Sequence, residues 1–225
     1  MSTANDRIFL LDVDDTLLDN DRFAADLGAR LEHAFGAAER DRYWRIFGRL
    51  RDELGRADYL ESLQGLRAGL EDNPELLRMA EFMLEYPFAA LLYPQAGAVI
   101  AHLGAHGVPV VLSDGDIVFQ PRKIRRAGLW DAVKGRVLIF LHKERMLDVV
   151  QRRYPARHYV MIDDKPQLLA AMKSSMGQRL TTIFVRQGHY AHAADLDAIE
   201  PPPDRAIERI GDMLELNLND LEGIS

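Results

Sequence analysis

The chain has 225 residues, 48% of them hydrophobic, and its 28 basic and 35 acidic residues give a formal net charge of −7. This size suits one medium domain, or a core with a modest insertion. The negative charge argues against a general electrostatic grip on nucleic acid or an anionic membrane, so neither is an expected partner. The absence of cysteine excludes disulfides and cysteine-based zinc sites. No targeting or membrane-spanning segment is recognisable, which predicts a cytoplasmic protein.

Short apolar runs alternate with helical patterns over most of the chain. The runs have the length and β-branched content of buried strands, and they cover residues 8–11, 108–112, 137–141, 158–162 and 181–185. The helical patterns between them cover residues 97–106, 117–127, 143–153 and 166–176. Such alternation predicts an α/β fold with a doubly wound parallel sheet.

The interval between the first two predicted strands has a different character. It contains no strand-like run, and stretches such as DRFAADLGARLEHAF repeat apolar residues at spacings of three and four, which predicts amphipathic helices. We therefore expect a core of residues 1–21 and 86–225 with an all-helical cap of residues 22–85. The tail, residues 201–218, opens with three prolines and predicts a terminal helix.

Within the predicted cap, one helix shows an aromatic stripe and several arginines. The stripe predicts a buried face and consists of Tyr43, Trp44, Phe47 and Leu50. The arginines predict solvated surface rather than an anion-binding patch, although one of them could meet an acidic leaving group; they are Arg42, Arg45, Arg49 and Arg51. A solvated loop is likewise predicted for residues 186–190, and a linker with a helix cap for residues 19–21.

Polar side chains follow four of the predicted strands. In open α/β sheets, ligands and catalytic groups collect at the carboxyl ends of the strands. The residues at these ends are Asp12, Asp14 and Thr16, then Ser113, Asp114 and Gly115, then His142 and Lys143, and finally Asp163, Asp164 and Lys165.

Carboxylates on neighbouring strand ends would repel one another in a partly dry cleft, and a divalent cation would remove that repulsion. Oxygen ligands without histidine or cysteine favour Mg²⁺. Lys143 and Ser113 then provide a charge and a donor for phosphoryl oxygens, which leaves a carboxylate free to attack phosphorus. The residues therefore predict an enzyme that forms an aspartyl phosphate.

This set of residues resembles the four motifs of the haloacid dehalogenase superfamily of hydrolases, over about residues 7 to 190. The first motif matches DVDDT at residues 12–16, and the second ends in Ser113. The third is best matched by Lys143, with Lys123 and Lys165 as alternatives, and the fourth is the acidic pair at 163 and 164. The helical interval lies where members of the superfamily carry a type 1 cap.

The resemblance implies a role for each residue. Asp12 would be the nucleophile, and Asp14 the general acid and base. Mg²⁺ would be held by Asp12, by the main-chain carbonyl of Asp14, and by the pair Asp163 and Asp164. Thr16 and Ser113 would orient the reacting groups, and Lys143 would neutralise their charge. The phosphate-binding residues would be Ser113, Asp114 and Lys143.

The resulting prediction is a Mg²⁺-dependent phosphatase that acts on a small phosphorylated metabolite, as a monomer or homodimer. Three alternatives stay open. A phosphomutase shares the aspartyl phosphate. A dehalogenase of the superfamily also uses an aspartate nucleophile, but it requires neither a metal nor the second aspartate. A catalytically silent binding protein is the third. The substrate itself is not visible in the sequence.

Overall fold

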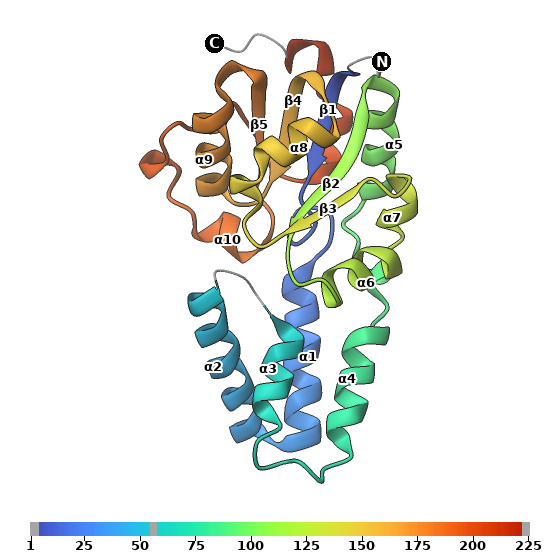
Figure 1. Cartoon of the computed structure of the whole chain (residues 1–225), viewed down its shortest axis with the longest axis vertical. Helices are drawn as coiled ribbons and strands as arrows, with labels where there is room; N and C mark the ends of the chain where they lie inside the picture. The colour runs from blue at the N-terminus through green and yellow to red at the C-terminus, as the bar shows by residue number, and fades with distance from the viewer. Residues whose placement is uncertain (1–4, 55–57, 222–225) are drawn as a thin grey trace.

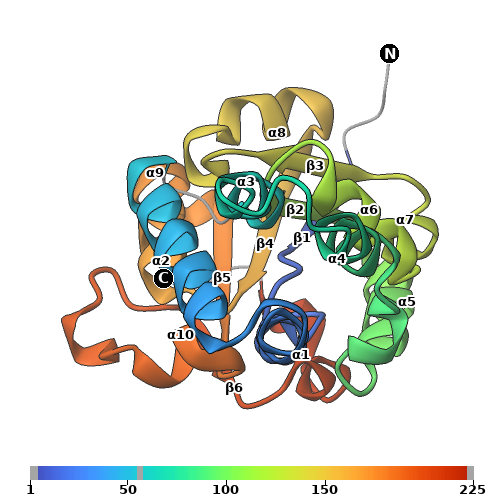
Figure 2. The ribbon, with the colours of Figure 1, turned by 90° about the horizontal axis from the view of Figure 1, so that it is seen from below.

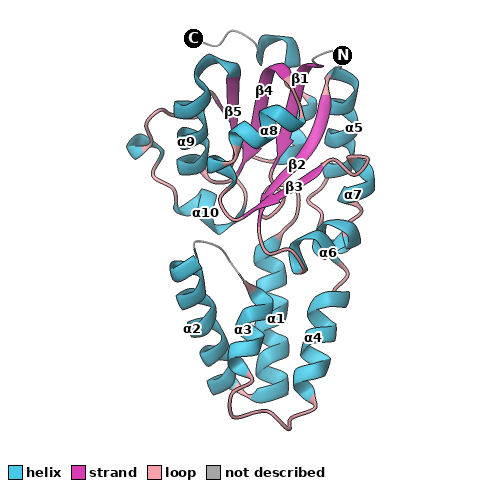
Figure 3. Ribbon diagram, viewed as in Figure 1, coloured by secondary structure: helices cyan, strands magenta, loops and turns pink. Residues whose placement is uncertain are grey.

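The computed structural model describes residues 5–54 and 58–221. In this part of the chain all strands lie in one sheet, and a bundle of helices projects from the sheet's lower edge (Figures 1 and 3). The strands are β1 (Asn5–Leu11), β2 (Val108–Asp114), β3 (Val137–Phe140), β4 (Ala156–Asp163), β5 (Leu180–Val185) and β6 (Arg205–Ile207). The first five overlap the five predicted runs.

The sheet is parallel throughout, with strand order β3-β2-β1-β4-β5-β6. The chain order reverses at β1, so the crevice beside β1 is the point at which a doubly wound sheet binds its ligands. The register places Leu11 of β1 opposite both Val111 and Ile162. The residues that follow these three positions therefore meet at one edge, and the predicted fold class is confirmed.

Alternate residues of β1 enter different cores, as the two-residue period of a strand requires. Phe9 and Leu11 belong to the cluster that includes Val99 of α5 (Ala96–His106). Ile8 and Leu10 belong to a second cluster, which is closed by α8 (Leu147–Arg153) and α9 (Pro166–Met176). Each buried side chain of this size contributes roughly 1.5–3 kcal/mol, so both faces hold the strand rigidly beneath the site.

The interval between β1 and β2 is helical, as predicted. Its helices are α1 (Asn20–Phe35), α2 (Ala37–Leu54), α3 (Tyr59–Leu66) and α4 (Glu75–Glu85). Asp19 begins α1 by accepting a hydrogen bond from the Arg22 amide at 2.9 Å. Seen from below, the four helices lie over the lower end of the sheet (Figure 2). The division into a core and a cap at residues 22 and 85 stays a prediction.

An aromatic cluster joins these helices to the α/β part. Phe23 of α1 lies 5.1 Å from the ring of Phe88 and 5.6 Å from that of Phe119, measured between ring centroids. Phe88 belongs to the short 3₁₀ helix η1 (Phe88–Leu91), and Phe119 begins α6 (Phe119–Arg126). The insertion therefore shares its buried surface with the rest of the molecule.

Two sequence predictions about secondary structure are wrong. The tail forms no helix over 201–218; it contributes β6 and the 3₁₀ helices η5 (Ile210–Leu214) and η6 (Leu218–Leu221). The prolines are followed by Asp204, whose carboxylate accepts a hydrogen bond from the Thr182 amide at 2.7 Å. This contact holds the segment against the sheet edge. Residues 143–153 form the 3₁₀ helix η2 (Lys143–Arg145) and then α8 rather than one helix.

The remaining helices are α7 (Leu129–Ala132), α10 (Gly188–Ala193) and the 3₁₀ helices η3 (Gly177–Arg179) and η4 (Leu196–Ala198). Over residues 5–54 and 58–221, every helix is too short or too polar to cross a bilayer.

Candidate active site

The carboxyl ends of β1, β2 and β4 bring four of the predicted residues to one edge of the sheet: Asp12, Ser113, Asp163 and Asp164. The amide of Asp12 donates to the carbonyl of Ile162 at 3.1 Å, which seats Asp12 beside the acidic pair that ends β4. Ser113 lies at the end of β2, and its hydroxyl accepts a hydrogen bond from Gln120 at 2.9 Å. These side chains are almost fully buried, so their charges act in a region of low dielectric constant.

Lys143 occupies the centre of this group. Its ammonium forms a short ion pair with Asp12 and a second one with Asp163 at 2.7 Å. The Lys143 amide donates to Asp114 at 2.7 Å, which fixes the start of η2 against β2. Of the three lysines weighed from the sequence, Lys143 is the one whose ammonium contacts Asp12 in the described chain.

Burial and neighbouring charges shift the acidity of this pair. Burial raises the pKa of Asp12, Lys143 opposes that effect, and Asp163 adds to it, so that the pKa reaches about 7. Burial alone would lower the pKa of Lys143, but Asp12 and Asp163 outweigh it and raise the pKa above its usual range. The lysine therefore stays charged and favours the ionised form of Asp12, as a nucleophile requires.

An acidic cluster lies beside the ion pair and fits a divalent cation. One carboxylate oxygen from each of Asp12, Asp163 and Asp164 lies within 4.8 Å of the others. Both carboxylate oxygens of Asp164 are buried without a hydrogen-bond partner among the described residues. Burial, and then the charges of Asp163 and Asp12, raise its pKa to about 9. A hard cation would satisfy these oxygens, and Mg²⁺ accepts such a donor set.

Asp164 should therefore make stability depend on pH. A folded-state pKa above the ordinary value means that its contribution is complete below about pH 4 and is lost as the pH rises towards 9. We expect Asp164→Asn to raise the free energy of unfolding at pH 8 by about 1 kcal/mol or more without metal. Urea unfolding between about pH 4 and pH 9 measures this free energy. Asp148→Asn, at an exposed position on α8, is the control. Equal pH slopes for wild type and Asp164→Asn would refute the assignment.

Asp14 lies apart from this cluster. Its carboxylate is held by the ammonium of Lys123 at 2.8 and 2.9 Å and by the amide of Gln120 at 3.2 Å. The side chain is 27% exposed and lines a cavity. The acidic cluster consists of carboxylates from Asp12, Asp163 and Asp164. Metal binding through the main-chain carbonyl of Asp14 stays a prediction.

Thr16 and Asp114 border the site in different ways. Thr16 is fully buried, and its carbonyl accepts a hydrogen bond from Gln187 at 3.1 Å, while its hydroxyl has no partner among the described residues. Asp114 accepts the Lys143 amide and also faces the cavity. The predicted roles of Thr16, Ser113 and Asp114 towards a substrate stay predictions.

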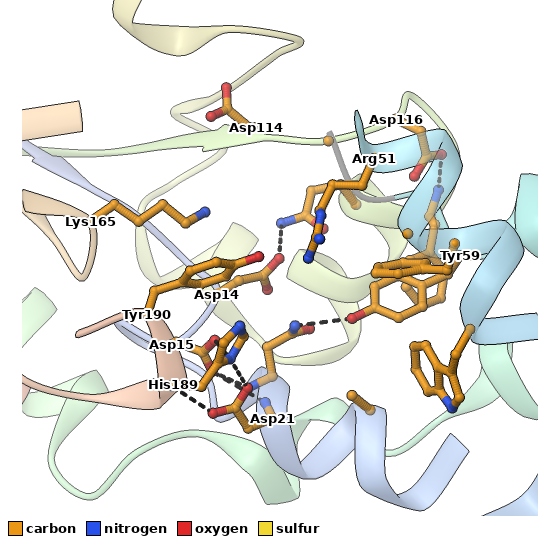
Figure 4. Close-up of a pocket in the computed structure, with 18 residues that line it drawn as sticks. Asp14, Asp15, Asp21, Arg51, Tyr59, Asp114, Asp116, Lys165, His189 and Tyr190 are labelled. Carbon is orange, nitrogen blue, oxygen red and sulfur yellow. Dashed lines mark hydrogen bonds and ion pairs between the residues drawn. The ribbon is translucent and has the colours of Figure 1, made fainter. Parts of the chain in front are cut away.

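A cavity of about 440 Å³, lined by Asp14 and Asp114, opens between the inserted helices and the sheet edge. Its polar side carries Asp14, Asp15, Asp114 and Gln120, and its apolar side carries Ala24, Trp44, Phe47, Tyr59 and Phe119. Arg51 of α2 and Lys165 at the start of α9 both point into it (Figure 4). The cavity therefore combines an apolar wall with two cationic groups and several carboxylates.

Arg51 is 46% exposed and ion-paired with Asp52 at 3.6 Å, as predicted for a solvated surface, and it also borders the cavity. His189 and Tyr190, from the stretch predicted as a solvated loop, line the cavity as well. Residues 188–193 form α10, and His189 is ion-paired with Asp21 at the start of α1. The sequence signal for this contact is Gly188, the residue before His189. A Cβ at position 188 would lie 2.4 Å from the Cβ of Asp15, so only glycine allows the two segments to approach this closely.

Asp15 lies in the turn between β1 and α1. It adopts a φ of 59°, in the left-handed region that aspartate tolerates better than most residues. Its carboxylate accepts the amides of Asn20 and Asp21 at 2.9 and 3.2 Å. Asp15 thus caps the first turn of α1 while also lining the cavity.

A doubly wound sheet whose first strand leads into a buried aspartate, ion-paired with a lysine that follows β3, defines an α/β fold with a charged site at the strand ends. The chain belongs to the haloacid dehalogenase-like hydrolases, whose family model matches residues 7–175. It is therefore a hydrolase. No protein of curated function matches the chain.

Solved structures support the same family. A haloacid dehalogenase-like hydrolase from Burkholderia xenovorans is 55% identical, with a TM-score of 0.89 over 95% of this chain and 97% of that one. L-2-haloacid dehalogenase from Xanthobacter autotrophicus is 19% identical, with a TM-score of 0.61 over 94% and 98%. A hydrolase from Bacillus subtilis, solved with magnesium, is 19% identical, with a TM-score of 0.63 over 93% and 97%.

The prediction of a phosphatase acting on a phosphorylated metabolite is wrong by these comparisons. Several similar folds are 2-haloacid dehalogenases, and the Xanthobacter enzyme is also known with chloropropionic acid covalently bound. The error has a chemical reason. A buried aspartate paired with a lysine can attack carbon as well as phosphorus, so the motifs specify the nucleophile and leave the electrophile open.

Proposed function

We propose that the protein hydrolyses small 2-haloacids through an ester of Asp12. The observation that carries this proposal is the buried Asp12–Lys143 ion pair, together with a cavity that is lined by Asp14 and Asp114 and has an aromatic wall and a cationic side chain from α2. The apolar wall suits an alkyl halide, and a cation suits its carboxylate. The similar folds of known reaction add support, although at about 19% identity that similarity concerns the fold.

The reaction has two half-steps. A carboxylate oxygen of Asp12 attacks carbon 2 of the haloacid, the carbon–halogen bond breaks, and halide leaves with the bonding electrons. Water then attacks the carbonyl carbon of the Asp12 ester, which releases the 2-hydroxy acid and a proton. We assign Asp14 as the base that takes this proton, because its carboxylate faces the cavity. Lys143 balances the charge of Asp12 between turnovers.

Halide release tests the proposal directly. Purified protein with 2-chloropropionate should release chloride and 2-hydroxypropionate in equal amounts, and chelator should not affect the rate. The absence of chloride release from a panel of 2-chloro and 2-bromo acids would reject the proposal. The proposed function also includes a small-molecule substrate, a cytoplasmic location and a monomeric or homodimeric state.

Arg51 should determine affinity for the substrate's carboxylate. A charge-assisted hydrogen bond is worth about 1.5–3 kcal/mol, so Arg51→Met should raise the KM for 2-chloropropionate by roughly 10- to 100-fold while kcat changes little. Arg49→Met is the matched control, because Arg49 lies on the same helix and its ion pair is with Glu53 at 3.9 Å. An unchanged KM in Arg51→Met would assign the carboxylate to another cation.

The acidic cluster favours a second candidate, a phosphomutase. Asp12, Asp163 and Asp164 would hold Mg²⁺, whose charge would neutralise the oxygens of a transferring phosphoryl group. Asp12 would again be the nucleophile. The two candidates separate on a phosphosugar panel with and without chelator. Metal-dependent isomerisation of a sugar phosphate without chloride release from haloacids would favour the mutase.

A further inference from the structure

Lys123 is a buried cation outside the group around Asp12. It lies on α6 with 1% of its surface exposed. Its ammonium donates to both oxygens of Asp14, at 2.8 and 2.9 Å, and to the side-chain oxygen of Asn20 at 3.0 Å. An ammonium has three protons, so its hydrogen-bonding capacity is filled by these contacts.

The surroundings of Lys123 leave Asp14 as the carboxylate that compensates its charge. The ammonium lies 5.5 to 5.9 Å from the ring centres of Phe119, Tyr59 and Phe88. Aromatic faces attract a cation weakly, and they supply no acceptor for its protons. Removing an ammonium from water costs several kcal/mol unless a partner compensates. Asp14 is the charged partner in contact with it, so the lysine can remain there only while Asp14 faces it.

The contacts of Lys123 also connect separate parts of the fold. Asp14 belongs to the loop after β1, whereas Asn20 begins α1. The side-chain amide of Asn20 donates to the hydroxyl of Tyr59 at 3.1 Å, and Tyr59 begins α3. A continuous series of hydrogen bonds therefore runs from Asp14 through Lys123 and Asn20 to Tyr59. Asp14, Asn20 and Tyr59 also line the cavity.

We propose that Lys123 is a positioning residue that sets the orientation of Asp14 and makes it depend on the seating of α1 and α3. When these helices are seated, Asn20 and Tyr59 complete the surroundings of the ammonium, and Asp14 is held towards the cavity. Displacement of the helices removes those partners and frees Asp14 to turn. The inference rests on the proposed function only in giving Asp14 the role of base.

The activity test compares two substitutions on α6. Lys123→Met keeps the approximate length of the side chain and removes the ammonium. Because a reacting group is then misplaced, kcat for halide release should fall roughly 10- to 100-fold. KM should stay within about 3-fold of wild type, because the residues that bind the substrate are unchanged. Arg122→Met is the matched control. Arg122 joins α6 to Glu85 of α4 through an exposed ion pair, so its loss should leave kcat unchanged.

A double-mutant cycle separates positioning from a general structural role. If Lys123 acts through Asp14, Lys123→Met should add less than about 3-fold to the loss of kcat already caused by Asp14→Asn. Tyr59→Phe, which keeps the ring and removes the acceptor for Asn20, should produce a smaller loss in kcat. Losses that multiply in the double variant, or a Lys123→Met enzyme with the kcat of Arg122→Met, would overturn the proposal.

A fluorescence measurement needs no substrate. The chain has two tryptophans, and Trp44 lines the cavity while Trp130 packs under Arg125. In a Trp130→Phe background, Lys123→Met should increase acrylamide quenching of Trp44, and Arg122→Met should not. Unchanged quenching in Lys123→Met would overturn the link to the inserted helices even if wild-type protein releases no halide. Absence of halide release would count against the proposed function alone.

Discussion

Asp12→Asn should abolish turnover and the covalent intermediate together. The amide of asparagine is a far weaker nucleophile than a carboxylate, so kcat for halide release should fall by about 10⁴-fold or more, towards the level left when a nucleophile is removed. Mass spectrometry of protein quenched during turnover should find the substrate's carbon skeleton on the peptide containing Asp12 in the wild type and on no peptide of the variant.

The control for this loss is an aspartate of the same charge far from the cavity. Asp148→Asn, on the exposed side of α8, should retain wild-type turnover and labelling. Circular dichroism should give the same fold for all three proteins. Residual turnover above about 10% in Asp12→Asn would mean that another residue is the nucleophile.

Lys143→Met should have the second largest effect. The substitution leaves Asp12 and Asp163 buried side by side without the cation that both contact. Loss of one partner from a buried ion pair typically destabilises a protein by about 3–5 kcal/mol. Turnover should fall by roughly 10³-fold, the upper range for removing one preorganised electrostatic contact.

Two measurements separate these effects. Urea unfolding gives the loss of stability, and kcat measured well below the unfolding midpoint gives the catalytic loss. Lys134→Met, at an exposed position, should change neither. Lys143→Arg should restore little, because a guanidinium is larger and planar. Turnover of Lys143→Met within ten-fold of wild type would contradict the central place given to this lysine.

The sheet was accessible from sequence because its signals are local. Short apolar runs followed by helical patterns located five strands within a few residues, and the polar residues after those runs identified Asp12 and Lys143. A parallel sheet brings the ends of its strands to one edge, so residues 131 positions apart could be placed together from topology alone.

The cavity was less accessible because its signals depend on tertiary packing. Arg51 has the spacing of a surface arginine on an amphipathic helix and is 46% exposed, and only the position of α2 over the sheet edge places it at the cavity. The helix α10 is six residues long, too short for its periodicity to distinguish it from a loop. The substrate's electrophile was inaccessible for a further reason, since aspartate and lysine serve carbon and phosphorus centres alike.

A single turnover in H₂¹⁸O with excess enzyme tests the central claim, that Asp12 carries the covalent intermediate. If water attacks the Asp12 ester, the oxygen of the released 2-hydroxy acid comes from the enzyme, and ¹⁸O enters the carboxylate of Asp12. Mass spectrometry should therefore find the label in the peptide containing Asp12 and unlabelled 2-hydroxypropionate. Labelled 2-hydroxypropionate with an unlabelled Asp12 peptide would mean direct attack by water, and would contradict this account.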